Sequence, residues 1–409
     1  MAPEHEKASS RMLPLLALGN VLAGMLLIPA ARPLLAERFP GSDGALHAFF
    51  SVNMFGAVLG APLVSWLADR RGSRRAMAVG LSLLDGVLLL ACLLPLPLWA
   101  VLALRTVQGA AGVGALSVVM GSARSPGPAA HGGAMGRMAA AVVAGIALGA
   151  PLGTLLLTGG PELVFVSAAA LAGLGALGCL TLAQGTRSEA RSPVRAVARA
   201  LKVPALFVGA ERFAVGCFVT TFSLYAHQAL GQSDREVGVG FSVFLLCFAL
   251  SSWTVGLASG RLSPALLLSF GATSFGLGFA SLGFVGEHGL WPLLASMGLA
   301  SGCIYTPSLC LASQAVPQTQ RSTAMGLLNG AGTLGMMLGT ALAGALSATL
   351  MHRGWARAEA TSAVFVLAGG AQWLVLAVAG PALLRAARAP DTGPAGIKPP
   401  AHGLPARWR

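Results

Sequence analysis

The sequence predicts an all-α membrane protein in which twelve transmembrane helices form two six-helix bundles. Charged residues make up only 10% of the 409-residue chain, whereas about 25% is usual in soluble globular proteins. Hydrophobic residues supply 55%, which excludes a disordered chain. Their apolar runs are long enough for membrane-spanning helices, which need about 20 residues each. Glycines repeated at an offset of 190 residues divide these spans into two halves.

Charge-free stretches locate ten of the twelve predicted helices. They cover 12–31, 44–68, 138–161, 163–186, 213–233, 237–260, 262–286, 288–320, 322–352 and 360–384. Two more spans, 76–95 and 97–120, each contain one charged residue, Asp85 and Arg105. We expect the seventh helix to begin near Leu206. We expect the tenth to end by about Gln314, because Pro317 follows shortly after.

The positions of Lys and Arg predict which side of the membrane each loop faces, because basic residues concentrate on the cytoplasmic side. With the N-terminus inside, the inside segments hold twenty basic residues and the outside segments hold five. We therefore expect a multi-pass protein of the bacterial inner membrane with both termini in the cytoplasm. The basic residues that give the net charge of +13 lie between the apolar runs, where they act as orientation signals. We therefore expect no nucleic-acid partner.

The predicted organisation has five parts. They are a cytoplasmic N-terminus at 1–11, a first bundle at 12–186, a cytoplasmic central loop at 187–205, a second bundle at 206–387 and a tail at 388–409. The tail is rich in Pro and Gly and is expected to be disordered. In the central loop, Arg191, Arg195 and Arg199 are spaced to share one face of a short helix. That helix either lies on the inner leaflet or only links the bundles.

The two halves echo each other in sequence. The segment after the second predicted helix reads S-W-L-A-D-R-R-G-S-R-R, and Arg261 lies 191 residues after its Arg70. In the same way, Gly145 and Gly149 are matched by Gly335 and Gly339, 190 residues further on. Parallel repeats of this kind place a substrate path between the halves.

At these residues the sequence resembles the major facilitator superfamily, in its drug- and arabinose-efflux-like branch. The family pattern G-x-L-A-D-R-x-G-R-[KR]-x matches here on or next to Asp69, Arg70, Gly72 and Arg74, while Ser65 replaces the leading Gly. The resemblance implies a latch in which the Asp pairs with inner helix ends of the other half and favours the outward-facing state. Otherwise the segment is a basic loop that only sets orientation.

A second motif lies in the fourth predicted helix, where L-R-T-V-Q-G-A-A-G-V-G-A loosely matches the family pattern R-x-x-Q-G-x-G-x-A. Burying an unpaired guanidinium in the membrane costs about 3 kcal/mol or more, so Arg105 should find a partner. The resemblance links this arginine to proton transfer. Arginine does not titrate, so it would act on an acid or an anionic group, or else pair with helix carbonyls. Asp85, the deepest acid in the predicted membrane, either carries a proton or pairs with a neighbour.

The fifth predicted helix carries a third motif. Gly145, Gly149, Pro151 and Gly153 resemble the pattern G-x-x-x-G-P-x-x-G-G, which is associated with antiporters. The proline is displaced by one position, and Thr154 replaces the final Gly. The alternative is a close-packing face of small residues without a transport role.

Several polar residues inside the spans are candidates for lining a cavity. They are Asn20, Asn53, Gln108, Thr221, Tyr225, Tyr305 and Asn329. Thr221 and Tyr225 are four apart and could share a helix face. Each candidate could equally form a hydrogen bond between helices. Glu211 and Arg212, near the inner end of the seventh helix, are expected to pair locally or with the other half.

The chain lacks the P-loop pattern for ATP and metal-ligand spacing among its six cysteines. We therefore expect a monomeric transporter with no cofactor, no metal and no enzymatic activity. The leading interpretation is proton-coupled export of a small amphipathic solute, with protons, that solute and the lipid bilayer as partners. One alternative is uptake or uniport of a sugar-like or other polar metabolite. Another is a membrane-embedded enzyme or a sensor without transport.

Overall fold

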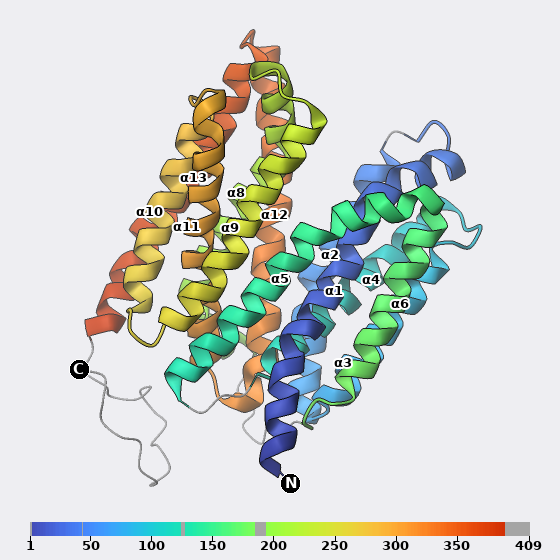
Figure 1. Cartoon of the computed structure of the whole chain (residues 1–409), viewed down its shortest axis with the longest axis vertical. Coiled ribbons are helices and arrows are strands. Elements are labelled where there is room, and N and C mark those ends of the chain that lie inside the picture. Colours follow the sequence, from blue (N-terminus) through green and yellow to red (C-terminus); the bar gives the residue numbers. More distant parts are fainter. Residues whose placement is uncertain (1, 43, 124–126, 185–193, 389–409) are drawn as a thin grey trace.

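The computed structural model describes residues 2–42, 44–123, 127–184 and 194–388. Within these ranges the chain forms thirteen α-helices and two short 3-10 helices. Figure 1 shows two bundles of long helices side by side, which lean together toward the end where α1 begins and α13 ends. We call this end the termini end and the opposite one the far end.

Each bundle contains six long helices. The first holds α1 (Ala2–Arg38), α2 (Ala45–Arg71), α3 (Arg74–Ala91), α4 (Leu98–Gly121), α5 (Pro128–Leu156), the 3-10 helix η1 (Leu157–Gly159) and α6 (Pro161–Cys179). A short helix, α7 (Val194–Ala200), precedes the second bundle. The second holds α8 (Lys202–Ala229), α9 (Asp234–Ala258), α10 (Pro264–Leu282), α11 (Glu287–Gln314), the 3-10 helix η2 (Gln318–Gln320), α12 (Arg321–His352) and α13 (Arg357–Arg388).

In the described part of the chain, eleven helices are long and apolar enough to cross a membrane. The twelfth long helix, α3, carries Arg74, Arg75 and Asp85 within its 18 residues. It packs against α4 and α6 and completes the first bundle. The all-helical, twelve-helix fold predicted from the sequence is therefore confirmed.

Many helix ends lie within a few residues of the predicted ones, but α5 begins at Pro128 instead of 138 and α6 ends at Cys179 instead of 186. Two further differences are informative. The first helix continues to Arg38, well past the predicted end, and Arg38 hydrogen-bonds to the carbonyls of Cys92, Leu93 and Leu94 at the end of α3. The seventh spanning helix, α8, begins at Lys202 instead of near Leu206. Pro204 does not prevent this start, because proline is tolerated in the first turn of a helix.

Some predictions concern residues that the structure does not describe. Arg191 and the first part of the predicted central loop lie outside the described residues, as does the tail from 389. Arg195 and Arg199 lie in the short helix α7 and are exposed, whereas Val197 is buried. The last spanning helix, α13, continues to Arg388.

Helix packing repeats between the bundles at the glycines that the sequence singled out. A Cβ atom on Gly149 of α5 would lie 2.1 Å from the Cβ of Met25 in α1. A Cβ atom on Gly339 of α12 would lie 2.0 Å from the carbonyl oxygen of Phe213 in α8. Both distances are shorter than any real contact, so these positions need glycine. The 190-residue repeat is thus also a repeat of helix contacts.

The outer surface of the two helix bundles is strongly apolar. Leu174 and Leu177 on α6 are 63% and 64% exposed, and Leu374 and Val378 on α13 are 65% and 66% exposed. Such extended apolar surface is unusual on a soluble protein. It is the surface expected of a helix bundle that contacts lipid chains.

Candidate functional site

At the termini end, Asp69 joins the two bundles. Its Oδ2 atom accepts hydrogen bonds from the backbone N–H of Thr323, at 2.7 Å, and from the Thr323 hydroxyl, at 2.8 Å. Thr323 lies in the first turn of α12, where backbone N–H groups lack partners within the helix and the helix dipole favours a negative charge. Asp69 is only 3% exposed, so these hydrogen bonds are shielded from water.

Arg74 strengthens the same contact. Its Nε and Nη2 atoms lie 2.8 and 2.7 Å from Oδ1 of Asp69. Nη2 also donates to the carbonyl of Gln318 in η2, at 2.5 Å. Gly72 makes this possible, because it caps α2 with φ +65° and turns the chain so that Arg74 can reach back to Asp69. Arg70 instead lies over the Trp66 ring, 5.0 Å from its centroid.

Small residues let the bundles approach closely around this contact. A Cβ atom on Gly326 of α12 would lie 2.7 Å from the hydroxyl oxygen of Ser65 in α2. The corresponding pair in the repeat is Gly136 of α5 and Gly256 of α9, where a Cβ on Gly136 would lie 2.6 Å from the Gly256 Cα. Two symmetry-related helix contacts therefore hold the bundles together at the termini end.

Further hydrogen bonds also cross between the bundles at this end. Asn329 of α12 donates to the hydroxyl of Ser117 in α4, at 3.0 Å. Nε2 of His131 lies 2.6 Å from the hydroxyl oxygen of Ser313. Arg321 donates to the carbonyl of Ala123, at 3.2 Å. Asn329, a predicted cavity residue, therefore contributes to the contact between the bundles.

A buried polar chain lies inside the first bundle. Gln108 is at its centre, because its Oε1 accepts from Nη1 of Arg105 at 2.6 Å and its Nε2 donates to Oδ1 of Asp85 at 2.5 Å. Asn53 of α2 also donates to Gln108 Oε1, at 2.5 Å, and to the Arg105 carbonyl, at 3.2 Å. Asp85, Arg105 and Gln108 are at most 5% exposed. The chain thus connects α2, α3 and α4.

The positive charge of Arg105 is compensated by this chain of hydrogen bonds and by an aromatic ring. Its guanidinium carbon lies 4.3 Å from the centroid of the Phe49 ring, a distance suited to cation–π attraction. Its Nε atom has no hydrogen-bond partner within the described residues. The sequence predicts that Arg105 needs a partner, and the structure places Gln108 between it and Asp85. The spacing of three along α4 puts Arg105 and Gln108 on one face, whereas the contact of Gln108 with Asp85 depends on how α3 packs against α4.

A second buried charged group lies in the second bundle. Glu211 and Arg212 of α8 form an ion pair, with Arg212 Nε 3.4 Å from Glu211 Oε2. The Ser301 hydroxyl of α11 donates to Glu211 Oε1, at 2.5 Å. The Arg212 guanidinium carbon lies 4.8 Å from the centroid of the Tyr305 ring and 5.5 Å from that of Phe248. The pair is thus local to the second bundle, and Tyr305 belongs to it.

The other predicted cavity residues, Thr221, Tyr225 and Asn20, differ in their surroundings. The Thr221 hydroxyl donates to the Cys217 carbonyl of its own helix. The Tyr225 hydroxyl donates to the Val285 carbonyl, at 3.3 Å, and its ring meets the edge of Phe365. Asn20 is half-buried on α1.

The motif in α5 packs the first bundle. Cβ atoms on Gly145, Gly149 and Gly153 would each collide with α1. Pro151 is exposed, and α5 continues past it to Leu156. These residues therefore position α5 against α1. A role of this motif in antiport stays a prediction.

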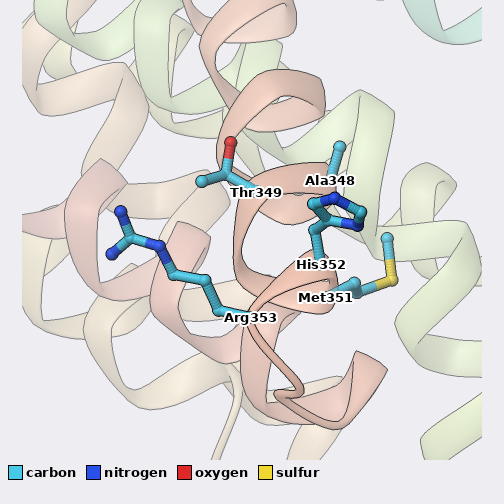
Figure 2. A pocket seen from close by; sticks show the side chains of 5 residues that line it. All are labelled: Ala348, Thr349, Met351, His352 and Arg353. Atoms are coloured by element: carbon cyan, nitrogen blue, oxygen red, sulfur yellow. The ribbon is translucent and has the colours of Figure 1, made fainter.

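Figure 2 shows a surface hollow lined by Ala348, Thr349, Met351, His352 and Arg353. It lies at the far end of α12, the opposite end of that helix from Thr323. It contains none of the residues that the sequence singled out. Among the described residues, no group of three or more His, Cys, Asp or Glu side chains is placed to hold a metal ion.

Comparison with known proteins agrees with this architecture. The family model of the Major Facilitator Superfamily matches residues 15–210 and 205–408. The crystal structure of the human organic anion transporter MFSD10 (TETRAN) is similar in fold, with a TM-score of 0.72 and 20% sequence identity over 91% of this chain and 99% of that chain. Comparison with curated proteins gives no match. The chain therefore belongs to the Major Facilitator Superfamily of membrane transporters, the family that its motifs predicted.

Proposed function

We propose that this transporter is a proton-coupled exporter of a small amphipathic solute. In this proposal the protein works as a monomer in the bacterial inner membrane, with both termini in the cytoplasm. The observation that carries the proposal is the buried chain Asp85–Gln108–Arg105. Charged groups at this depth are costly and are commonly retained for function.

Protonation of Asp85 would change the hydrogen bonds of three helices. As a carboxylate, Asp85 accepts from Gln108 and offsets the charge of Arg105 through it. A proton on Asp85 removes that negative charge and weakens the bond from Gln108. Gln108 and Asn53 then lose the arrangement that joins α3 and α4 to α2. The protonation state of one acid thereby favours one arrangement of the first bundle.

Alternating access would use the contact at the termini end. With the termini cytoplasmic, bundles that meet there form an outward-facing state. The hydrogen bonds from Thr323 to Asp69 must break when the bundles separate at this end. Contacts made in one state and not in the other set the equilibrium between the two states. Asp69 and Arg74 would thus stabilise the outward-facing state.

The test uses purified protein in liposomes that contain a pH-sensitive dye. Wild-type protein is expected to move protons when fluorescent amphipathic solutes are added, and to concentrate those solutes when a pH gradient is imposed. Asp85→Asn is expected to let solutes equilibrate but to lose more than about 90% of the proton movement, since the amide cannot carry a proton. Glu287→Gln, an exposed acid at the start of α11, is the matched control. Wild-type proton movement in Asp85→Asn would reject the role of Asp85.

A further inference from the structure

We propose that a proton binding to His131 separates the two bundles at the termini end, so that the pH on that side of the membrane regulates the transporter. The proposal goes beyond the coupling of solute to protons, and it rests on the proposed function only for its effect on transport. The separation of the bundles can be measured without any solute.

His131 lies buried where the two bundles meet. It is the fourth residue of α5 and is 4% exposed, and its Nε2 atom lies 2.6 Å from the hydroxyl oxygen of Ser313 in α11. The Ser313 hydroxyl donates its own proton to the Cys310 carbonyl, at 2.9 Å. The imidazole Nε2–H therefore donates to Ser313, and the neutral ring is sufficient for this hydrogen bond.

Close packing shields His131 from water. A Cβ atom on the next residue, Gly132, would collide with the hydroxyl of Ser259, and one on Gly136 would collide with Gly256 of α9. This stretch of α5 is thus pressed against the second bundle. A charge on the imidazole would have little hydration as long as the bundles touch, and burying a charge without a compensating partner is costly.

The local electrostatics also favour the neutral ring. Arg321 of α12 donates from Nε to the carbonyl of Ser313, at 3.2 Å, so its guanidinium and the His131 ring contact the same residue. His131 lies in the first turn of α5, where the helix dipole disfavours a positive charge. The C-terminal end of α11 would favour a cation, but it already receives Arg321. An imidazolium would therefore destabilise the contact between the bundles.

The elements packed against this part of α5 offer no compensating acid. Among the described residues, the titratable and charged groups that they present are Arg321 of α12, Cys310 of α11 and Arg261 just after α9, while α5 itself carries Arg137. Arg137 and Arg261 are exposed. None of these four groups is a carboxyl, so a proton on His131 adds a cation beside other cations.

Separation of the bundles reverses the preference for the neutral ring. His131 then leaves Ser313 and Arg321 and becomes hydrated, and an exposed imidazole changes charge at about pH 6.5. The separated state therefore binds the proton more tightly, and a ligand favours the state that binds it better. Between pH 7.5 and 5.5, the ratio of separated to closed protein should rise up to about tenfold. With the termini cytoplasmic, an acidified cytoplasm would shift the transporter toward its inward-facing state.

The experiment measures the distance between the bundles with spin labels, in lipid nanodiscs at pH 7.5 and 5.5. Labels at Arg71→Cys and Leu262→Cys, exposed in the first and second bundle, keep the basic residues around His131 in place. Cys247 and Cys303 are replaced by alanine, because the other four cysteines are buried. Both faces of a nanodisc share one pH, so the result does not depend on orientation. Acidification is expected to raise the population at longer distance, relative to the shorter, about tenfold.

Variants identify the titrating group. His131→Gln keeps a side-chain N–H for Ser313 but has no charge change between pH 5 and 8, so its populations should change less than about twofold. His288→Gln, exposed at the start of α11 at the far end, is the matched control and should respond as the wild type does. Arg321→Gln should respond less than the wild type, because the imidazolium then meets one cation fewer in the closed state. If His131→Gln does not fold, the wild-type titration and Arg321→Gln still test the proposal.

Two results would overturn the inference. One is a wild-type distance distribution that does not lengthen on acidification, as a merely structural role for His131 predicts. The other is a wild-type response in His131→Gln, which would assign the pH dependence to another group such as Asp69. The proposed function is tested separately, by proton movement in liposomes. If that coupling fails while the distance response persists, the proposed function is wrong and the switch stands. If flux is coupled but the distances do not respond, only the switch is wrong.

Discussion

Arg105 and Arg212 are both cations inside the membrane-spanning bundles, but they are compensated in different ways. Arg212 is next to its acid in sequence and forms an ion pair with it. Arg105 reaches Asp85 only through the amide of Gln108, and its guanidinium also rests on Phe49. The arrangement at Arg105 depends on geometry as well as on charge. A planar guanidinium can donate to Gln108 and face an aromatic ring at the same time.

Arg105→Lys separates geometry from charge. Lysine keeps the positive charge, but it is a compact point charge and cannot reproduce the planar contact with both Gln108 and Phe49. We expect near-normal expression and a loss of proton-coupled flux of at least about tenfold, measured in liposomes against wild-type protein. Near wild-type flux would show that Arg105 only balances charge, and would remove it from the candidate site.

The sequence predicts that Asp85 and Arg105 lie inside the membrane, because both interrupt apolar runs. It does not predict that Gln108 bridges them, because Asp85 lies on another helix whose rotation depends on packing. The partners of Glu211 were missed for a similar reason. Ser301 and Tyr305 lie on α11, about ninety residues away in the chain, and nothing local to Glu211 indicates them.

At the scale of helices, spans are predictable where the chain is apolar, and their ends depend on distant contacts. The end of α11 at Gln314 agrees with the prediction from Pro317. The end of α1 does not agree, because Arg38 is held by carbonyls at the end of α3. In a sequence, a charged residue after an apolar run indicates a loop. Here Arg38 instead belongs to α1 and donates to the free carbonyls at the end of α3.

Asp69→Asn tests the contact between α2 and α12. Asparagine can still accept one hydrogen bond from Thr323, but it loses the charge that attracts Arg74 and the helix N-terminus. Hydrogen bonds to charged groups contribute about 1.5–3 kcal/mol, so the ratio of the two states should change roughly ten- to a hundredfold. We expect distances between the bundles at the termini end to lengthen, while the protein stays folded.

Spin labels at Arg71→Cys and Arg261→Cys report this distance. Both residues are exposed at the termini end, one in each bundle. The double-labelled protein with Asp69 intact gives the reference distribution, and Asp69→Asn should add a population at longer distance. An unchanged distribution in the variant would exclude the latch role of Asp69. Glu287→Gln, at the far end of the second bundle, should leave the distribution unchanged.

At the scale of the whole molecule, the sequence predicts the family and the two-bundle fold but not the conformation. The small residues Ser65, Gly136, Gly256 and Gly326 show which helix faces can approach closely. They do not show whether those faces are in contact, because an alternating-access protein uses one sequence for two states that differ by a few kcal/mol. The contacts at the termini end can therefore be identified only from the three-dimensional structure.

The orientation in the membrane decides whether the contact at the termini end closes the cytoplasmic or the external side. The excess of basic residues predicts that this end lies in the cytoplasm. We expect an impermeant maleimide to label Arg235→Cys, exposed in the first turn of α9 at the far end, in intact cells. Arg199→Cys, exposed on α7 at the termini end, should be labelled only after the cells are opened.

The parent protein for this labelling experiment needs two cysteine substitutions. Cys247 and Cys303 are partly exposed, whereas the other four cysteines are buried, so both are replaced by alanine and the cysteine-depleted parent serves as the blank. Labelling of Arg199→Cys in intact cells would place the termini end outside. The contact made by Asp69 would then close the external side, and the structure would represent the inward-facing state. The predicted effect of Asp69→Asn on the distance between the bundles would remain, but its consequence for the direction of access would reverse.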